Sequence, residues 1–441
     1  MDFTPHTESE IAGMLKEIGV SRIDDLFECI PAECRVAGGL SLPAGMTEAE
    51  VVDLLQGMAG RNDPPSASFL GAGANDHYVP AAIKHLIGRG EFLTSYTPYQ
   101  PEVSQGTLQA QFEYQTMVAS LLGMDVSNAS MYEGATAVAE ACNVACRNVR
   151  RNVVVVSRAV HPQYREVLAT YLGADRLREV GFDPATGATD TAALAAALQG
   201  DVGAVVVQSP NFFGVIEDVQ RAADLAHGAQ ALLVATFTEA LAFGLIEAPG
   251  NLGADIAAGE GQSLGLPLSF GGPYIGLFAV KAPFVKGMPG RLVGRTRDSQ
   301  GSDCYVLTLA AREQHIRRER AGSNICSNEG LCALSVAIYL SLLGTTGFAR
   351  LAAYNHARTE SVKSRLAARP GLALPFAGAT FNEFVVRLPG PADEAVARCD
   401  TAGLVPGLAL GTHYPELADC LLVSVTERRT DAQIDTLVST L

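Results

Sequence analysis

Three short runs of apolar residues in the middle of the chain constrain its fold more than any other feature. They cover residues 153–156, 202–207 and 231–235, and stretches with helix-like spacing of apolar residues separate them. Unbroken apolar runs of this length are typical of strands that are buried on both faces of a parallel sheet. Repeated strand and helix units of this kind predict a doubly wound α/β domain.

The N-terminal part of the chain has a different pattern. Apolar residues at helical spacing in 11–18 and 47–58 predict two helices, within a helical segment that we place at residues 1–67. Residues 68–106 are rich in Gly, Pro, Tyr and Asn, which predicts a long ordered loop with one short helix at about 81–87. Loops of this length are usually functional.

The C-terminal part of the chain again alternates between helix and strand patterns. These patterns predict a helix that ends near Arg369, strands at 383–388 and 420–425, and a final helix. We therefore expect a large α/β domain over residues 68–345 and a small C-terminal α/β domain over residues 346–441.

The charge of the chain limits the partners that it can bind. The sequence has 32 basic and 47 acidic residues, a net charge of -15, which argues against nucleic acid as a ligand. We find no secretory signal pattern and no apolar run long enough to cross a bilayer. We therefore expect no membrane association and a cytoplasmic location.

The nine cysteines include no Cys-x-x-Cys pair, so they do not predict a disulfide framework or a structural zinc site. Cys142 and Cys146 are four residues apart, a spacing that would place two metal ligands on one helical face. Their Ala and Val neighbours favour core packing instead, and we assign no metal.

A turn of small residues at 133–136 stands before a predicted helix and is a candidate phosphate site. Backbone N–H groups at a helix start can hold a phosphate, here at Gly134 and Thr136. Plain helix capping is the alternative interpretation of the same residues. The neighbouring Glu133 works against an anion at this place.

Two further side chains follow predicted strands and are candidates for holding a flat aromatic cofactor such as pyridoxal phosphate (PLP). The ring of His161 could stack on the cofactor, or it could be an ordinary surface histidine. The carboxylate of Glu239 could pair with a protonated pyridine nitrogen, or it could cap a helix start.

Long strings of the sequence resemble the first subunit of the two-subunit glycine decarboxylases, the P-protein of the glycine cleavage system. The resemblance covers close to the full length. Its clearest pieces are FLGAGANDHYVP (69–80), SYTPYQPEVSQGTLQAQFEYQTM (95–117), MYEGATAVAEA (131–141), GEGQSLGLPLSFGGPYIG (259–276) and REQHIRRERAGSNICSN (312–328). It implies the fold-type I architecture of PLP-dependent transferases, similar to aspartate aminotransferase, with a large mostly parallel sheet domain and a small C-terminal α/β domain.

The resemblance also exposes a missing residue. Fold-type I enzymes hold PLP as a Schiff base on a lysine that follows a late strand of the large domain. Gln262 stands near that position here, and an amide cannot form a Schiff base. The five lysines of the chain lie elsewhere, at Lys16, Lys84, Lys281, Lys286 and Lys363. We therefore expect a chain that is catalytically incomplete by itself.

For the complex, the resemblance implies glycine dehydrogenase (aminomethyl-transferring) activity. The complex would decarboxylate glycine with PLP held by a second subunit, and it would transfer the aminomethyl group to the lipoyl group of the H-protein. Two electrons end on the lipoyl sulfurs, so the activity is that of an oxidoreductase. Two copies of each subunit are implied. Glu133 and Glu239 stand where related chains more often carry Asp, and residues 235–245 depart most from the family pattern.

Two other functions remain open on the sequence alone. The chain could be a stand-alone PLP-dependent lyase or aminotransferase that uses one of its five lysines. It could also be a noncatalytic assembly or regulatory protein that kept the fold after losing the lysine.

The loop between residues 68 and 106 is where this chain would contribute to a shared active site. The candidates are Tyr96, Tyr99, Gln100 and Glu102, with His77 and Tyr78 given less weight. The flanking prolines at 98 and 101 lower the entropy cost of presenting these side chains to a neighbour. The alternative is a loop that only packs at the subunit interface.

The basic stretch from Arg312 to Arg320 is a candidate surface for steering an acidic lipoyl carrier. A solvated helix face and salt bridges between subunits are the alternatives.

Overall fold

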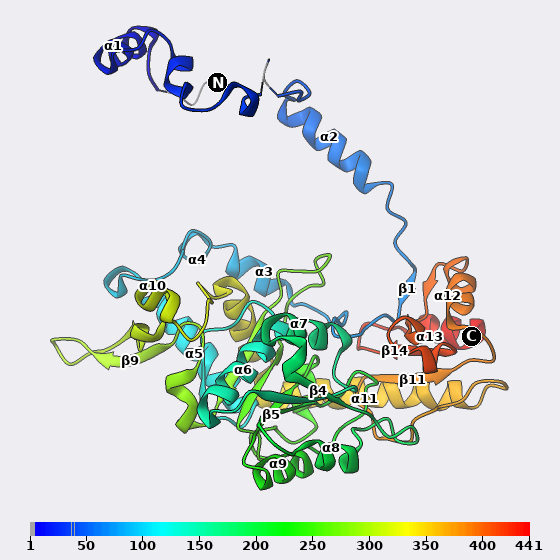
Figure 1. Ribbon diagram of the computed structural model, residues 1–441. Coiled ribbons are helices and arrows are strands. Elements are labelled where there is room, and N and C mark those ends of the chain that lie inside the picture. The colour runs from blue at the N-terminus through cyan, green and yellow to red at the C-terminus, as the bar shows by residue number, and fades with distance from the viewer. Residues whose placement is uncertain (1–4, 37, 39) are drawn as a thin grey trace. The chain divides into compact units, whose positions relative to one another are not determined.

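A computed structural model describes residues 5–441 except residues 37 and 39 (Figure 1). The chain forms two compact units, one ending at Pro64 and the other spanning Pro65–Leu441. We describe each unit separately.

The first unit contains the two helices expected at the N-terminus. Helix α1 spans Glu8–Ile18 and α2 spans Glu48–Ala59. Thr7 and Thr47 begin them, each accepting a hydrogen bond from the backbone N–H three residues on. Neither helix has a buried residue, so their apolar side chains have no core within this unit.

The second unit is built on a seven-stranded sheet. Four neighbouring strand pairs, from β7 through β6, β5 and β3 to β4, are parallel, and β8 and β2 are antiparallel at one edge. In spatial order the strands are β2 (Val126–Ser127), β8 (Gly276–Val280), β7 (Ile256–Glu260), β6 (Leu232–Thr236), β5 (Val202–Gln208), β3 (Val153–Ser157) and β4 (Leu177–Val180). The three predicted strands are β3, β5 and β6, so the expected mostly parallel α/β fold is confirmed.

Helices cover both faces of this sheet, which explains the unbroken apolar runs. In β5, Val205 and Val207 face one core, and Ala204 and Val206 face the other. The first core includes residues of α5 (Gln105–Leu121), α9 (Val219–Gly228) and α11 (Gly330–Ala367), and the second includes residues of α6 (Gly134–Val149) and α7 (Pro162–Leu172). A strand between two apolar layers carries apolar side chains on both faces along most of its length.

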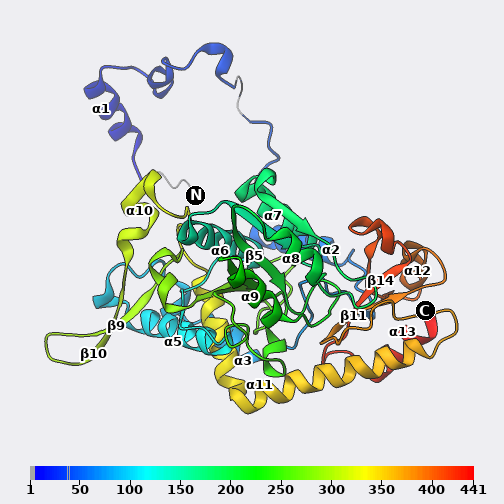
Figure 2. The same cartoon turned by 60° about the horizontal axis from the view of Figure 1, so that its bottom comes forward.

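Helix α11 connects this sheet to a second, smaller sheet (Figure 2). Its helical conformation is interrupted at Gly344, where φ is 58° and ψ is 177°. We call residues 79–343 the large lobe and residues 346–441 the small lobe. Whether the two lobes are separate domains with a boundary at 345/346 remains a prediction.

The small lobe contains the elements that its sequence predicts. An antiparallel sheet has the order β11 (Glu383–Arg387), β14 (Cys420–Ser424), β13 (Leu408–Ala409), and it packs with α12 (Ala392–Asp400), α13 (Asp431–Thr440) and the end of α11. A short parallel pair joins β1 (Ala67–Ser68) to β12 (Leu404–Val405). The core of this lobe includes Phe384, Leu421 and Leu437.

The remaining elements are short and lie around the large sheet. The predicted helix at 81–87 is confirmed as α3. The others are α4 (Gly90–Leu93), α8 (Thr191–Ala197), α10 (Gln314–Arg317) and an antiparallel hairpin of β9 (Val293–Arg297) and β10 (Asp303–Leu307).

Helix α11 also corrects an expectation. By length and composition it could cross a membrane, so the expectation that no apolar run is long enough was wrong. In this fold α11 packs against α5, with Ala333, Val336 and Tyr339 buried in the core. A buried core helix passes the same test of length and composition.

The two cysteines with helical spacing are core residues. Cys142 and Cys146 are both buried on α6. Among the described residues, no group of three or more His, Cys, Asp or Glu side chains is arranged to hold a metal ion.

Gly214, a large-lobe residue that packs against the small lobe, gives a first test of the packing between the two lobes. Gly214 has φ +80°, and a Cβ there would lie 2.0 Å from the carbonyl oxygen of Glu383 in β11. We expect Gly214→Ala to lower the free energy of unfolding by at least about 3 kcal/mol, since backbone strain and overpacking add. Gly200→Ala is the matched control, because Gly200 has φ +84° with open space around it; it should cost about 1–2 kcal/mol. Equal shifts in urea unfolding would contradict this packing.

Candidate functional site

Three of the expected cofactor residues lie beyond the carboxyl ends of the strands of the large sheet. His161 follows β3, Glu239 follows β6 and Gln262 follows β7. Because these strands are parallel, their carboxyl ends meet at the same edge, where open α/β sheets bind ligands. All three side chains form hydrogen bonds with residues 71–78, which we call the inner segment.

Gln262, which stands near the expected position of the missing lysine, holds the backbone of the inner segment. Its Oε1 accepts a hydrogen bond from the Asn75 N–H at 3.0 Å. Its Nε2 donates to the carbonyl oxygens of Asn75 at 3.1 Å and Leu266 at 2.8 Å. The side chain is buried, and its amide therefore meets partners at both ends.

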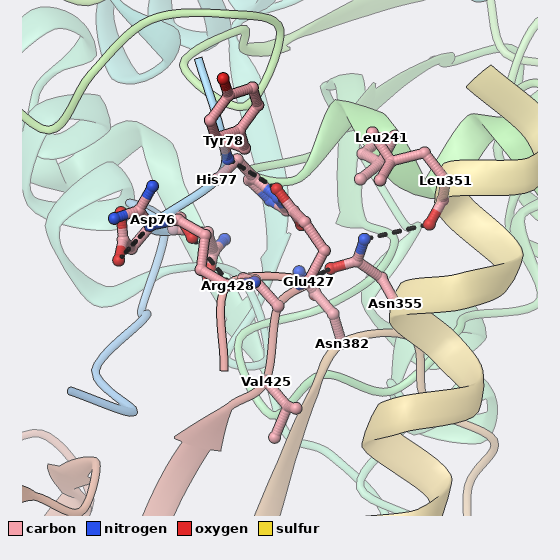
Figure 3. A network of polar contacts seen from close by, with 12 residues as sticks. Asp76, His77, Tyr78, Leu241, Leu351, Asn355, Asn382, Val425, Glu427 and Arg428 are labelled. Atoms are coloured by element: carbon pink, nitrogen blue, oxygen red, sulfur yellow. Dashed lines mark hydrogen bonds and ion pairs between the residues drawn. The ribbon is translucent and has the colours of Figure 1, made fainter. Parts of the chain in front are cut away.

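Glu239, the candidate partner of a pyridine nitrogen, pairs with His77 instead. His77 Nε2 lies 2.9 Å from Glu239 and its Nδ1 lies 2.9 Å from Glu427. Glu239 also accepts hydrogen bonds from Asn382 Nδ2 at 2.8 Å and from the N–H of Leu241 at 3.0 Å. Figure 3 shows His77 directed at Glu427, with Asn382 below them. The contact with the Leu241 N–H agrees with the alternative interpretation, in which Glu239 caps the start of a helix.

Electrostatics in this triad favour the charged forms. Burial alone would lower the pKa of His77, but Glu239 and Glu427 outweigh it and raise the pKa to about 10. Burial acts to raise the pKa of both carboxyls, yet His77 leaves that of Glu239 below its usual value and that of Glu427 at about 2. The triad thus consists of one buried imidazolium between two carboxylates.

His161 is buried and not on the surface. Its Nδ1 accepts a hydrogen bond from the N–H of Gln163 at 3.2 Å, so its Nε2 carries the proton and donates to the carbonyl of Ala72 at 2.9 Å. Burial lowers the pKa of His161 to about 4, which keeps the ring neutral. The ring packs edge-on against Phe212, with a centroid distance of 4.8 Å.

The candidate phosphate turn at the start of α6 is occupied by carboxylates. Glu133 accepts hydrogen bonds from the N–H of Thr136 at 2.8 Å and from its hydroxyl at 2.9 Å. Glu260 accepts one from the N–H of Gly134 at 3.0 Å. Burial raises the pKa of Glu260 to about 7, although four backbone N–H groups work against the shift. The capping alternative describes these contacts.

This arrangement does not fit a bound PLP. A phosphate at the start of α6 would meet the carboxylates of Glu133 and Glu260. These carboxylates already accept the backbone N–H groups that would bind the phosphate. A pyridine nitrogen at Glu239 would compete with His77, and Gln262 offers no primary amine. Each position that a cofactor would need is taken by a side chain of the chain itself.

The other predicted residues belong to a second place on the molecule. The side chains of Tyr96 and Tyr99 are 80% and 54% exposed, and Gln100 and Glu102 are also exposed. The Tyr99 hydroxyl accepts a hydrogen bond from Arg291 at 2.9 Å, and the guanidinium lies 4.9 Å from the ring centre. Among the described residues, no hydrogen bond joins this loop to the inner segment.

Arg291 in turn fixes the base of this loop. It is buried and forms an ion pair with Glu313 at 2.8 Å. The loop is therefore anchored at Tyr99 while Tyr96 projects from it.

The sequence analysis missed the residues that the small lobe contributes. Glu427 and Glu383 both contact the inner segment, but Glu427 is 350 residues from His77. No short motif spans such a distance. The only available signal was the string at 69–80, whose His77 we had placed in the loop that faces a partner.

The fold defines the class to which the chain belongs. It is similar to the structure of the sphingosine-1-phosphate lyase of Burkholderia pseudomallei, with a TM-score of 0.67, 16% sequence identity and 93% of each chain covered. Together with the closer structure described next, this similarity confirms the fold-type I architecture that the resemblance implies.

Closer comparisons define the family. The model of the family "Glycine cleavage system P-protein" matches residues 1–441. A protein named probable glycine dehydrogenase (decarboxylating) subunit 1, from Geobacillus thermodenitrificans, is 48% identical over 441 residues, covering 100% of this chain and 98% of that one. A crystal structure of glycine decarboxylase (P-protein) in inhibitor-bound form is 42% identical, with a TM-score of 0.89 and full coverage of both chains. The chain belongs to the glycine cleavage system P-protein family, which confirms the resemblance.

The buried triad predicts a pH dependence of stability. Because the folded-state pKa of His77 is raised from 6.5 to about 10, its charged pairing stabilises the fold fully below pH 6.5 and is lost as the pH rises through about 10. We expect His77→Gln to cost about 3–5 kcal/mol below pH 6.5. The difference in the free energy of unfolding between the variant and the wild type should shrink as the pH approaches 10. Urea unfolding at several pH values measures this difference. His85→Gln, at an exposed residue of α3, should unfold like the wild type; a difference for His77→Gln that does not change with pH would contradict the ionic pairing.

Proposed function

We propose that this chain is the lysine-less subunit of a heteromeric glycine decarboxylase. With a partner subunit that carries PLP and its lysine, the complex decarboxylates glycine and transfers the aminomethyl group to the lipoyl group of the H-protein. The proposed assembly is a heterotetramer of two plus two subunits in the cytoplasm. The observation that carries the proposal is Gln262, a buried amide near the expected lysine position that is hydrogen-bonded to the chain's own backbone.

Family membership supports the reaction, and the pocket supports the division of labour. The relatives are named as subunit 1 of glycine dehydrogenase (decarboxylating), which implies a second subunit. PLP, when bound in that subunit, supplies an electron sink for decarboxylation. This chain's own contribution is structural support and side chains presented at the shared site.

The exposed loop is the proposed contribution to the partner's site. Tyr96, Gln100 and Glu102 are exposed, and the contact of Tyr99 with Arg291 holds the loop in place. A phenol or amide could orient the glycine carboxylate by hydrogen bonding. The alternative is a loop that only packs between subunits.

Two rival functions are separated by simple measurements. For a stand-alone PLP enzyme, the purified chain would show a visible absorption band that borohydride removes. For a noncatalytic assembly protein, glycine decarboxylation by the partner would not depend on this chain.

Exchange of labelled bicarbonate into glycine tests the proposed function directly. We expect no exchange with this chain alone, little with the partner alone, and full exchange when both are mixed, because lysine and loop come from different chains. Exchange by this chain alone, given PLP and the lipoyl carrier, would overturn the proposal.

Tyr96→Phe tests the loop. If the hydroxyl contacts glycine, its loss should lower the exchange rate of the assembled complex roughly tenfold, the cost of one hydrogen bond to a charged group. Tyr171→Phe is the matched control, because Tyr171 is an exposed tyrosine of α7 outside the loop. This change should leave the rate unchanged. Equal rates for both variants, with intact assembly, would favour mere packing.

The basic stretch gives a separate test of carrier docking. Arg317 and Arg318 are exposed at α10 and its end. Changing both to Glu should weaken lipoyl-carrier affinity roughly tenfold at low salt, since charge pairs at a surface are individually weak. Arg350→Glu, at an exposed position on α11, is the control. Unchanged affinity after the double change would remove this surface from the proposal.

A further inference from the structure

The inner segment joins the two lobes at three of its residues. Each of them contacts the large lobe on one side and the small lobe on the other. The three bridges are Ala72 between His161 and Glu383, Asn75 between Gln262 and Ser424, and His77 between Glu239 and Glu427. A segment with these contacts lies between the lobes, with Gly71, Asn75 and His77 buried.

We infer that the inner segment is a built-in occupant of the cofactor pocket, one that replaces PLP in filling the pocket and in holding the lobes together. Restoring a lysine at position 262 would therefore not let this chain bind PLP. The inference does not depend on the proposed function, because it concerns the chain alone and involves no decarboxylation.

The inner segment packs closely against both lobes at its two glycines. A Cβ at Gly71 would lie 2.2 Å from Glu383 Oε1 and 2.6 Å from Ser424 Cβ, so only glycine passes there. At Gly73 a Cβ would lie 3.2 Å from the His161 ring. The backbone of the segment thus lies directly against the ring that was expected to stack on a cofactor.

The charge of the segment also matches what the pocket requires. Glu239 is buried and needs a cation, which in a cofactor-loaded enzyme would be a protonated pyridine nitrogen. His77 supplies an aromatic N–H cation at 2.9 Å. Its second nitrogen meets Glu427, whose other oxygen accepts the N–H of Tyr78 at 2.6 Å.

The small lobe secures the outer end of the segment (Figure 3). Thr426 donates to the carbonyl of Asp76 at 2.7 Å, and Arg428 and Arg429 bond the Asp76 carboxylate. Asn355 of α11 donates to the carbonyl of Leu351 and accepts the N–H of Glu427 at 3.1 Å, which fixes the backbone that carries that carboxylate.

Restoring the lysine tests the inference. Gln262→Lys and its matched control Gln262→Met are incubated with PLP, reduced with borohydride, digested and mapped by mass spectrometry. We expect the same pyridoxyl peptides from both variants, none of them containing residue 262. A pyridoxyl group on the introduced amine at position 262 would overturn the inference.

Two measurements on the wild-type chain keep the inference testable if Gln262→Lys fails to fold. Amide hydrogen exchange should show the N–H groups of Ala72, Asn75 and Tyr78 protected like those of β5, whereas the exposed turn at 299–301 exchanges fast. Deoxypyridoxine phosphate, which lacks the reactive aldehyde, should show no saturable binding. Fast exchange in the inner segment, or saturable binding that deprotects it, would contradict a permanent occupant.

Discussion

The buried cation between two carboxylates organises the second unit of this protein. An imidazolium and two carboxylates cannot be buried separately at acceptable cost, but His77 compensates Glu239 and Glu427 at 2.9 Å on either side. Since Glu239 belongs to the large lobe and Glu427 to the small lobe, charge compensation requires the lobes to be docked. The fixed relation of the two lobes thus follows from an electrostatic requirement as well as from apolar packing.

The parallel sheet explains why these groups meet. Strands that run in one direction bring their carboxyl ends to a common edge, and the loops after β3, β6 and β7 deliver His161, Glu239 and Gln262 there. In related folds that edge receives a ligand. Here the same geometry receives a stretch of the polypeptide, and the polar groups that would bind a ligand bind its backbone and its histidine.

The sequence predicted those features that follow from local composition. The runs at 153–156 and 202–207 were recognisable because strands buried on both faces need no polar position. Strand β4 was not predicted, because Arg178 and Glu179 interrupt its apolar residues and leave no apolar run. Strand β7 was missed as well, since it ends in glycine and glutamate.

Only the large-lobe residues of the candidate site could be predicted from the sequence. His161 and Glu239 could be recognised from their place after predicted strands of the large lobe, and Gln262 through the family resemblance. Their partners in the small lobe could not, since the pairing of His77 with Glu427 depends on the tertiary fold of the intervening chain. The pairing of Glu239 with His77 had no local signal either.

A pocket that is filled from within has a consequence for biogenesis. Enzymes that depend on a vitamin-derived group gain part of their stability from binding it, and their folded population falls when the vitamin is scarce. The inner segment is covalently part of the chain, so its presence at this place does not depend on the concentration of a free ligand. The folded population of this chain should therefore not depend on the supply of the vitamin.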